Sequence, residues 1–328
     1  MTEPPNATAG GEKPPMTMGR FIALALKGAA MGAANVIPGV SGGTIALITG
    51  IYEELIHTLN SFGSVAARLL FKGKIREVFD HVNGFFVCAI GIGLVASWFT
   101  LAKLMKHLLA DEQSELFTMA FFFGLILASV FTVGQRVQRW FLQDAGLFIL
   151  GAGLAGGIML IPHSTPSTSP FYIFLCGAIG MSAMILPGIS GSFILLMMGS
   201  YLHIITAITK LDLAVLAPFA LGCVMGLLAF SHAISFILKK FHNATLALLA
   251  GFVAGSLAVI WPWKNAIKES VLIGEKTKVI VIGYRWELPV PDNEFYLALL
   301  LIAAGAGLVP LMELFASSKA KSNSPPGE

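Results

Sequence analysis

Long apolar stretches separated by short polar segments make up most of this chain. A helix needs about 20 apolar residues to cross the hydrocarbon core of a bilayer. Six stretches are long enough to cross alone, and they run over Gly84–Met105, Leu116–Val133, Ala145–Ile161, Leu213–Leu238, Ala244–Trp261 and Phe295–Phe315. The pattern therefore predicts an all-α integral membrane protein with several spans.

Two longer apolar stretches, Phe21–Leu59 and Phe171–Ile208, are each interrupted near the middle by Pro-Gly-x-Ser-Gly. Proline lacks the backbone N–H and stops the helix before it, and glycine permits backbone conformations closed to other residues. One arm, such as Phe21–Val36, rises about 24 Å as a helix, less than a hydrocarbon core of about 30 Å. Each stretch fits a re-entrant helical hairpin, and two tilted crossings are the alternative. The broken backbone must be buried in protein or line a wet cavity, because lipid offers it no hydrogen bonds.

The motif at these breaks occurs twice, which indicates an internal duplication. The first copy reads Asn35-Val-Ile-Pro38-Gly39-Val-Ser41-Gly42-Gly43-Thr44, and the second reads Met184-Ile-Leu-Pro187-Gly188-Ile-Ser190-Gly191-Ser192 at a constant offset of 149 residues. Further along, Thr118, Gly124 and Ser129 are matched by Thr245, Gly251 and Ser256 at an offset of 127.

The repeated unit is thus a hairpin followed by three spans. Repeat 1 covers residues 19–162 with its hairpin at 21–59, and repeat 2 covers residues 163–316 with its hairpin at 171–208. A hairpin returns to its own side of the membrane, whereas three spans end on the other side. The second repeat is therefore predicted to be inverted relative to the first, with both breaks meeting near the middle of the membrane.

Composition and charge agree with a membrane location. Hydrophobic residues make up 56% of the 328 residues and charged residues 12%, against about 25% charged in a soluble domain. The net charge of +3 is too small and too scattered to suggest nucleic acid. More Lys and Arg fall on the side of the two ends of the chain, which predicts that both termini are cytosolic. The polar segments 1–18 and 317–328 are expected to be disordered tails on that side.

Two internal polar segments carry predictions of their own. Residues Ser61–Gly84 mix basic and apolar side chains, which is typical of an amphipathic helix on the inner leaflet. The outer loop 263–294 contains the run Lys278-Val-Ile-Val-Ile-Gly-Tyr, flanked by Gly274 and Pro289, and predicts a small β-hairpin. The three cysteines lie far apart in apolar stretches, so neither a metal site, a disulfide framework nor a cofactor is expected.

The two breaks are the first place where ligand chemistry is expected. The arm after each break begins with unpaired N–H groups and the positive end of a helix dipole, which suits phosphate or carboxylate. The candidates for binding a phosphate are Asn35, Pro38, Gly39, Ser41, Gly42, Gly43 and Thr44 in repeat 1, and Pro187, Gly188, Ser190, Gly191 and Ser192 in repeat 2. The alternative is that these residues only allow short helices to pack closely.

Ionisable residues at membrane depth are the second set of candidates, because such groups are costly there. Lys27, Arg136 and Arg139 are predicted to supply positive charge to a phosphate, while Glu53, Glu54 and His57 are candidates for gating or for carrying a coupling proton. The alternatives are snorkelling for the lysine, positive-inside anchoring for the arginines and a cytosolic arm end for the glutamates.

At Asn35–Thr44, Thr49–Glu54 and Leu186–Gly191 the chain resembles the polyprenyl-phosphate transporter family, long catalogued as a domain of unknown function. The resemblance covers about Gly19 to Ala316. It implies a multi-pass protein of a bacterial or archaeal plasma membrane that moves undecaprenyl phosphate, or a related polyprenyl phosphate, from the outer to the inner leaflet for cell-envelope synthesis. The lipid is then the expected partner, carried by alternating access with its phosphate held between the two breaks. The oligomeric state is open between a monomer and a homodimer.

The strongest rival among enzymes is the undecaprenyl-pyrophosphate phosphatase family, which is similar in having inverted halves and a Pro-Gly-x-Ser-Arg-Ser motif. Gly42 and Gly191 occupy the position of that arginine here, and no Glu precedes Pro38 or Pro187 within its hairpin. Pyrophosphate cleavage would then lack both its charge clamp and its base. We therefore expect no enzymatic activity, with a membrane hydrolase and a secondary transporter of small anions as the alternatives.

Overall fold

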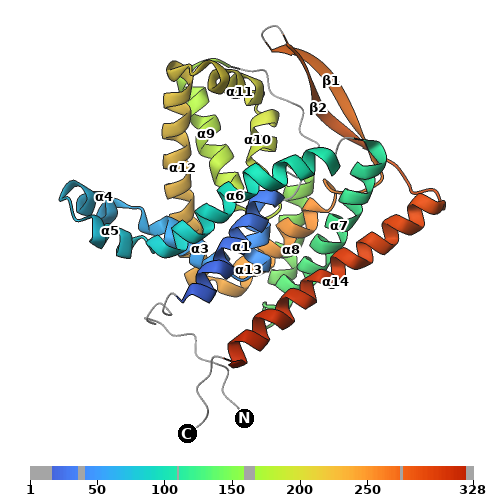
Figure 1. The fold of residues 1–328 in the computed structure, drawn as a ribbon, viewed down its shortest axis with the longest axis horizontal. Coiled ribbons are helices and arrows are strands. Elements are labelled where there is room, and N and C mark those ends of the chain that lie inside the picture. The colour runs from blue at the N-terminus through green and yellow to red at the C-terminus, as the bar shows by residue number, and fades with distance from the viewer. Residues whose placement is uncertain (1–16, 36–40, 109–110, 159–166, 274–275, 323–328) are drawn as a thin grey trace.

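The computed structural model describes residues 17–35, 41–108, 111–158, 167–273 and 276–322, and it is mainly helical (Figure 1). The first half contains α1 (Met18–Ala34), α2 (Gly42–Ile48), α3 (Tyr52–Ser61), α4 (Ser64–Phe71), α5 (Ile75–His81), α6 (Gly84–Leu108), α7 (Glu112–Gln135) and α8 (Leu142–Gly157). The second half contains α9 (Pro170–Ile185), α10 (Gly191–Met197), α11 (Tyr201–Lys210), α12 (Leu213–Lys240), α13 (His242–Ser256), β1 (Lys264–Ile273), β2 (Lys276–Trp286) and α14 (Asn293–Ser322).

Several of these helices can cross a membrane. Among the described residues, α7, α12 and the part of α14 over Asn293–Leu311 are long and apolar enough, and the number rises from 3 to 5 if two bent helix pairs each form one span. The bent pairs are α5 with the first part of α6, at 76°, and α10 with α11, at 110°. The predicted class of multi-pass all-α membrane protein is confirmed. The predicted spans Ala145–Ile161 and Ala244–Trp261 correspond to α8 and α13. These helices have 16 and 15 residues and rise about 24 Å or less, which is short of a hydrocarbon core of about 30 Å.

The two halves use the same helix pairings. Helix α1 packs along α6 as α9 packs along α12, while α7 packs along α14 as α13 packs along α8. Glycines allow the close approach at matching positions: a Cβ on Gly28 would collide with the α6 carbonyl of Ile90, and one on Gly177 with the α12 carbonyl of Phe219. Small residues at such contacts are typical of membrane helices, since backbones can then approach closely. The sequence duplication is therefore accompanied by a duplication of packing.

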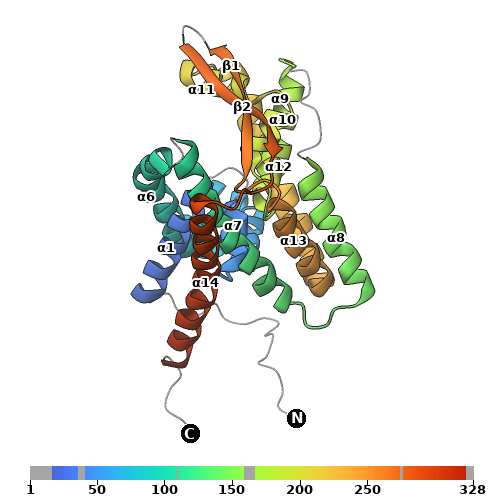
Figure 2. The same ribbon diagram turned by 90° about the vertical axis from the view of Figure 1, so that its right-hand side faces the viewer.

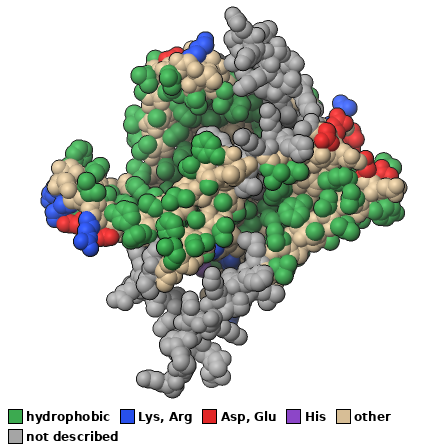
Figure 3. Space-filling view, viewed as in Figure 1, with side chains coloured by type: hydrophobic (Ala, Val, Ile, Leu, Met, Phe, Trp, Pro, Cys, Tyr) green, Lys and Arg blue, Asp and Glu red, His purple; other side chains and the backbone are tan. Residues whose placement is uncertain are grey.

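The surface of the long helices is apolar. Figure 3 shows hydrophobic side chains over α6, α12 and α14, while charged side chains gather at the tip of the α4–α5 arm and near the N-terminal ends of α7 and α14. Phe99 on α6 is 74% exposed and Ile149 on α8 is 70% exposed. Large apolar patches of this kind face lipid rather than water in a membrane protein.

Two features project from the helical body, and both fall where the sequence predicts them. Helices α4 and α5 form an arm on which Phe71 and Ile75 are exposed beside the basic side chains of Arg68 and Lys72. Strands β1 and β2 pair antiparallel from Lys264 opposite Trp286 onward, so the predicted β-hairpin is confirmed. The hairpin lies at the end of the molecule opposite to the C-terminal end of α14 (Figures 1 and 2).

Candidate functional site

The first hairpin is held together at its tip and at its base. At the tip, the backbone N–H of Gly42 donates to Oδ1 of Asn35 over 2.7 Å. At the base, Nζ of Lys27 donates to the carbonyl oxygen of Thr49 over 2.8 Å. The start of α2 is bonded to Asn35 just after α1, and the end of α2 is bonded to Lys27 within α1, so α2 runs antiparallel alongside α1. Pro38 and Gly39 lie outside the described residues.

The second hairpin repeats this arrangement with different side chains. The hydroxyl of Tyr172 on α9 donates to the carbonyl oxygen of Met198, at the end of α10, over 2.6 Å. Met198 corresponds to Thr49 at the offset of 149 residues, so the same carbonyl is bonded by a lysine in one repeat and by a tyrosine in the other. Sequence reasoning missed Tyr172, since an aromatic residue within an apolar stretch gives no sign of this role.

The two breaks are in direct contact. Ser41 Oγ donates to the carbonyl oxygen of Leu186 over 3.2 Å, and the backbone N–H of Gly188 donates to Thr44 Oγ1 over 2.8 Å. Gly188 has a φ of +82°, which glycine adopts at little cost, and this conformation is part of the turn at the second break. Ser41 is only 2% exposed and Thr44 is fully buried. The structure thus brings residues 41–44 of the first motif against residues 186–188 of the second, although the two motifs are 149 residues apart in sequence.

Within the first break the polar groups are satisfied by the protein itself. Ser41 Oγ accepts from the N–H of Thr44 and caps α2, while Asn35 accepts from the N–H of Gly42. Gly43 lies so close to the second break that a Cβ there would be 2.7 Å from the carbonyl oxygen of Ile185. Among the described residues, the N–H groups of Gly42 and Thr44 at the start of α2 are therefore both bonded within the protein.

The second break is more open. Ser190 makes no side-chain cap to α10, and its hydroxyl pairs with that of Ser192 over 2.9 Å, at the surface. Ser190 and Gly188 line a cavity of about 20 Å³ together with residues of α8, α10 and the segment after α13. That volume suits one water molecule and is too small for a phosphate group.

The predicted cations lie at the other end of α2. Arg136 donates from Nη1 to the carbonyl oxygen of Leu47 over 3.0 Å and from Nη2 to that of Ile48 over 3.1 Å, beside the Lys27 contact. The last carbonyls of a helix lack partners and carry partial negative charge, which attracts cations. Lys27 and Arg136 are thus brought together, but a helix of seven residues, about 10 Å long, separates them from Ser41. Arg139 is exposed and has no ion-pair or hydrogen-bond partner among the described residues.

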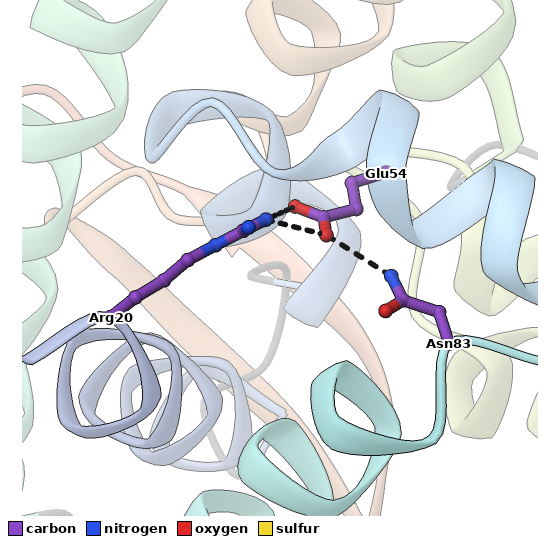
Figure 4. Close-up of polar contacts among 3 residues, drawn as sticks. All are labelled: Arg20, Glu54 and Asn83. Carbon is purple, nitrogen blue, oxygen red and sulfur yellow. Dashed lines mark hydrogen bonds and ion pairs between the residues drawn. The ribbon is translucent and has the colours of Figure 1, made fainter. Parts of the chain in front are cut away.

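The gating candidates lie at the base of the first hairpin, apart from the serines. Glu54 accepts from Nη2 of Arg20 over 2.8 and 3.1 Å and from Nδ2 of Asn83 over 3.1 Å, which ties α3 to α1 and to the residue before α6 (Figure 4). Glu53 lies 3.9 Å from His242. His57 instead lines a pocket of about 300 Å³ between α3, α5 and α12. The sequence contained a signal for the Arg20–Glu54 pair, because the two residues carry opposite charges on the two arms of the predicted hairpin. The prediction from sequence did not use this signal.

Comparison with known proteins assigns the chain to a family. The apolar helices define a multi-pass membrane protein, and residues 31–277 match the family described as "VCA0040-like: Undecaprenyl phosphate translocase-like". The chain belongs to this family. It is 38% identical over 301 residues to a polyprenyl-phosphate transporter of Vibrio cholerae serotype O1, which covers 90% of this chain and 97% of that protein. It is 33% identical over 260 residues to a polyprenyl-phosphate transporter of Staphylococcus aureus, covering 72% and 85%. No solved structure matches it.

Proposed function

We propose that this chain carries a polyprenyl phosphate across the plasma membrane, from the outer to the inner leaflet, for reuse in cell-envelope synthesis. The contact between the two Pro-Gly-x-Ser-Gly breaks carries the proposal. It creates one central place where the donors of both repeats converge, as a carrier with a single phosphate site needs. The names of the two relatives support the identity of the lipid.

The proposed mechanism is alternating access between two inverted repeats. The matching pairings of α1 with α6 and α9 with α12, and of α7 with α14 and α13 with α8, support a two-fold relation between the halves. Each hairpin would be re-entrant, with its break near the middle of the membrane. The conformation with a cavity of about 20 Å³ is then an occluded state between outward and inward opening.

The contact between the two breaks would act as the gate, and its hydrogen-bond donors would also form the phosphate site. The hydroxyl of Ser41 and the N–H of Gly188 now donate across the contact between the repeats. A phosphate oxygen is a stronger, charged acceptor for such donors than a carbonyl or a hydroxyl. A phosphate arriving at Ser190 and Ser192 would therefore compete for these donors and separate the repeats. Backbone N–H groups around both breaks would then donate the remaining hydrogen bonds to the phosphate.

The cations would act at a later step. Lys27 and Arg136 stand at the base of the first hairpin, and the matching positions in the second repeat, 176 and 263, hold Cys176 and Trp263. We infer that this unequal charge draws the phosphate toward the base of the first hairpin, on the cytosolic side, after the gate opens. Glu53, Glu54 and His57 would then couple opening at that side to proton uptake.

The test is a leaflet-crossing assay with purified protein in liposomes that contain a fluorescent polyprenyl phosphate. Protein-dependent crossing is expected, and a double variant Ser41→Ala and Ser190→Ala should slow it by about tenfold or more, because two hydrogen bonds to a charged ligand are lost. Ser129→Ala is the matched control, since that buried serine donates only within α7. Liposomes that show no protein-dependent crossing would refute transport. Steady phosphate release from polyprenyl pyrophosphate would instead favour the hydrolase.

A further inference from the structure

A groove of about 620 Å³ opens between α7 and α8 on the lipid-facing surface. Its walls include Phe131 and Gly134 of α7, Trp140 of the connecting turn, and Ala145 and Ile149 of α8. The other lining side chains are apolar except that of Gln135. Phe131 is 67% exposed and Ile149 is 70% exposed, so this α7–α8 groove is accessible from the membrane.

The groove follows from how the helices are paired. Helices α7 and α8 are consecutive in the chain, yet α7 packs along α14 and α8 packs along α13. Figure 2 shows α7 and α8 approaching each other at the turn that joins them and diverging away from it. The groove therefore lies in the seam between two helix pairs, where a lateral opening would form if the pairs moved apart.

The end of the groove near the turn has a defined shape. Trp140 Nε1 donates to the carbonyl oxygen of Gly134 over 3.2 Å, and its ring meets that of Phe148 edge-on at 6.0 Å. These contacts fix the indole as the floor of the groove. Tryptophan is favoured where apolar and polar regions of a membrane meet, because it has one apolar body and one polar atom.

Two arginines stand at this same end. The turn after α7 carries Arg136, whose guanidinium uses two of its nitrogens on the end of α2, and Arg139, which is exposed without a partner among the described residues. Guanidinium groups bind phosphate through paired hydrogen bonds. A phosphate monoester carries a charge of about −2, whereas the phosphate diester of a membrane phospholipid carries about −1. Two guanidinium groups therefore match the monoester better.

We propose that the α7–α8 groove holds the prenyl chain of the transported lipid while its phosphate lies at Arg139, beside the base of the first hairpin. The identity of the lipid rests on the proposed function. Lipid tails are as apolar as the groove, so moving the prenyl chain from the bilayer into the groove yields little free energy. The role of the groove is therefore to position the lipid. It keeps the phosphate within reach of Arg139 and Arg136 as the lipid passes between the protein and the leaflet.

The proposal is tested by photolabelling in nanodiscs of phosphatidylethanolamine and phosphatidylglycerol, using a polyprenyl phosphate with a diazirine on its chain. Label should fall on residues 130–149, and excess unlabelled polyprenyl phosphate should compete with it, while phosphatidylglycerol should not. Filling the groove with Ala145→Phe and Ile149→Trp together should reduce this label about tenfold, a steric penalty equivalent to about 1.4 kcal/mol. Arg139→Gln should reduce it without changing the shape of the groove.

The matched control adds the same two side chains one position further along α8. Gly146→Phe and Leu150→Trp both fall on exposed positions outside the groove lining, and a Cβ on Gly146 would meet no other atom within 4 Å. The control should keep the label. Competable label that maps elsewhere, or equal competition by phosphatidylglycerol, would overturn the groove and leave transport standing. Absence of both competable label and leaflet crossing would instead remove the proposed function.

Discussion

The hydrogen bond from Gly188 to Thr44 predicts how one side chain holds the two repeats together. Thr44 is fully buried, and its hydroxyl accepts from the N–H of Gly188 over 2.8 Å. Thr44→Val keeps the shape of the side chain and removes the acceptor. Leaving a buried N–H without a partner costs about 1–3 kcal/mol. Opening of the second break should then become easier by about 5- to 150-fold, at 1.4 kcal/mol for each factor of ten.

Hydrogen exchange read by mass spectrometry measures this opening directly. In peptides that contain Gly188, one amide should exchange about 5- to 150-fold faster in Thr44→Val than in the parent protein. Thr44→Ser is the control, because it keeps the hydroxyl and loses one methyl group, so exchange of that amide should change by about fourfold at most. Equal exchange in the parent protein and in Thr44→Val would show that Thr44 does not hold the second break.

Three further perturbations follow from other contacts. Arg136→Lys keeps the charge but cannot make both bonds to the end of α2, so leaflet crossing should fall less than in Arg136→Met, and equal loss would show that charge at this position is irrelevant. The Arg20–Glu54 pair has side chains 24% and 31% exposed, so Glu54→Gln should cost only about 1 kcal/mol of unfolding free energy, and the exchange Arg20→Glu with Glu54→Arg should restore part of it if the pair is direct. Burial lowers the pKa of Lys264, at the base of the β-hairpin, from 10.5 to about 8. The folded state therefore binds fewer protons than the unfolded state between these pH values, and the free energy of unfolding should rise with pH across that window. Lys264→Met should remove this rise in thermal unfolding measurements.

The features that could be predicted from the sequence depend on local residue types. Proline and glycine within apolar stretches predict the two breaks, and a run of Val and Ile between turn residues predicts the β-hairpin found at Lys264–Trp286. The repeated motif predicts that the breaks face each other, and Ser41 and Thr44 do contact the second break. In each case the information lies within a few residues or in the duplication itself.

The positions of the cations depend on how α2 lies against its neighbours. Lys27 and Thr49 are each 11 residues from Pro38, so an antiparallel hairpin places them at the same level, and this signal was present in the sequence. Arg136 gives no such signal, because it reaches Leu47 from another helix 89 residues away. Packing between distant spans decides such contacts, and a single sequence does not contain that information.

The hydrogen bonds of the central contact can be compared with those that the same donors would make to a phosphate. The two bonds between the breaks, Ser41 to Leu186 and Gly188 to Thr44, are each worth about 0.5–1.5 kcal/mol net, so breaking both costs about 1–3 kcal/mol. The same two donors would then bind a charged phosphate at about 1.5–3 kcal/mol each, or about 3–6 kcal/mol together. For these two bonds alone, binding exceeds breaking, so the donors at the contact favour the exchange of their protein acceptors for a phosphate. The same surplus would slow release, and the cations at the base of the first hairpin, which are absent from the matching positions of the second, are placed to lower that barrier on one side only. In the proposed mechanism the serines would control the opening of this contact, and Lys27 and Arg136 would favour release at the base of the first hairpin.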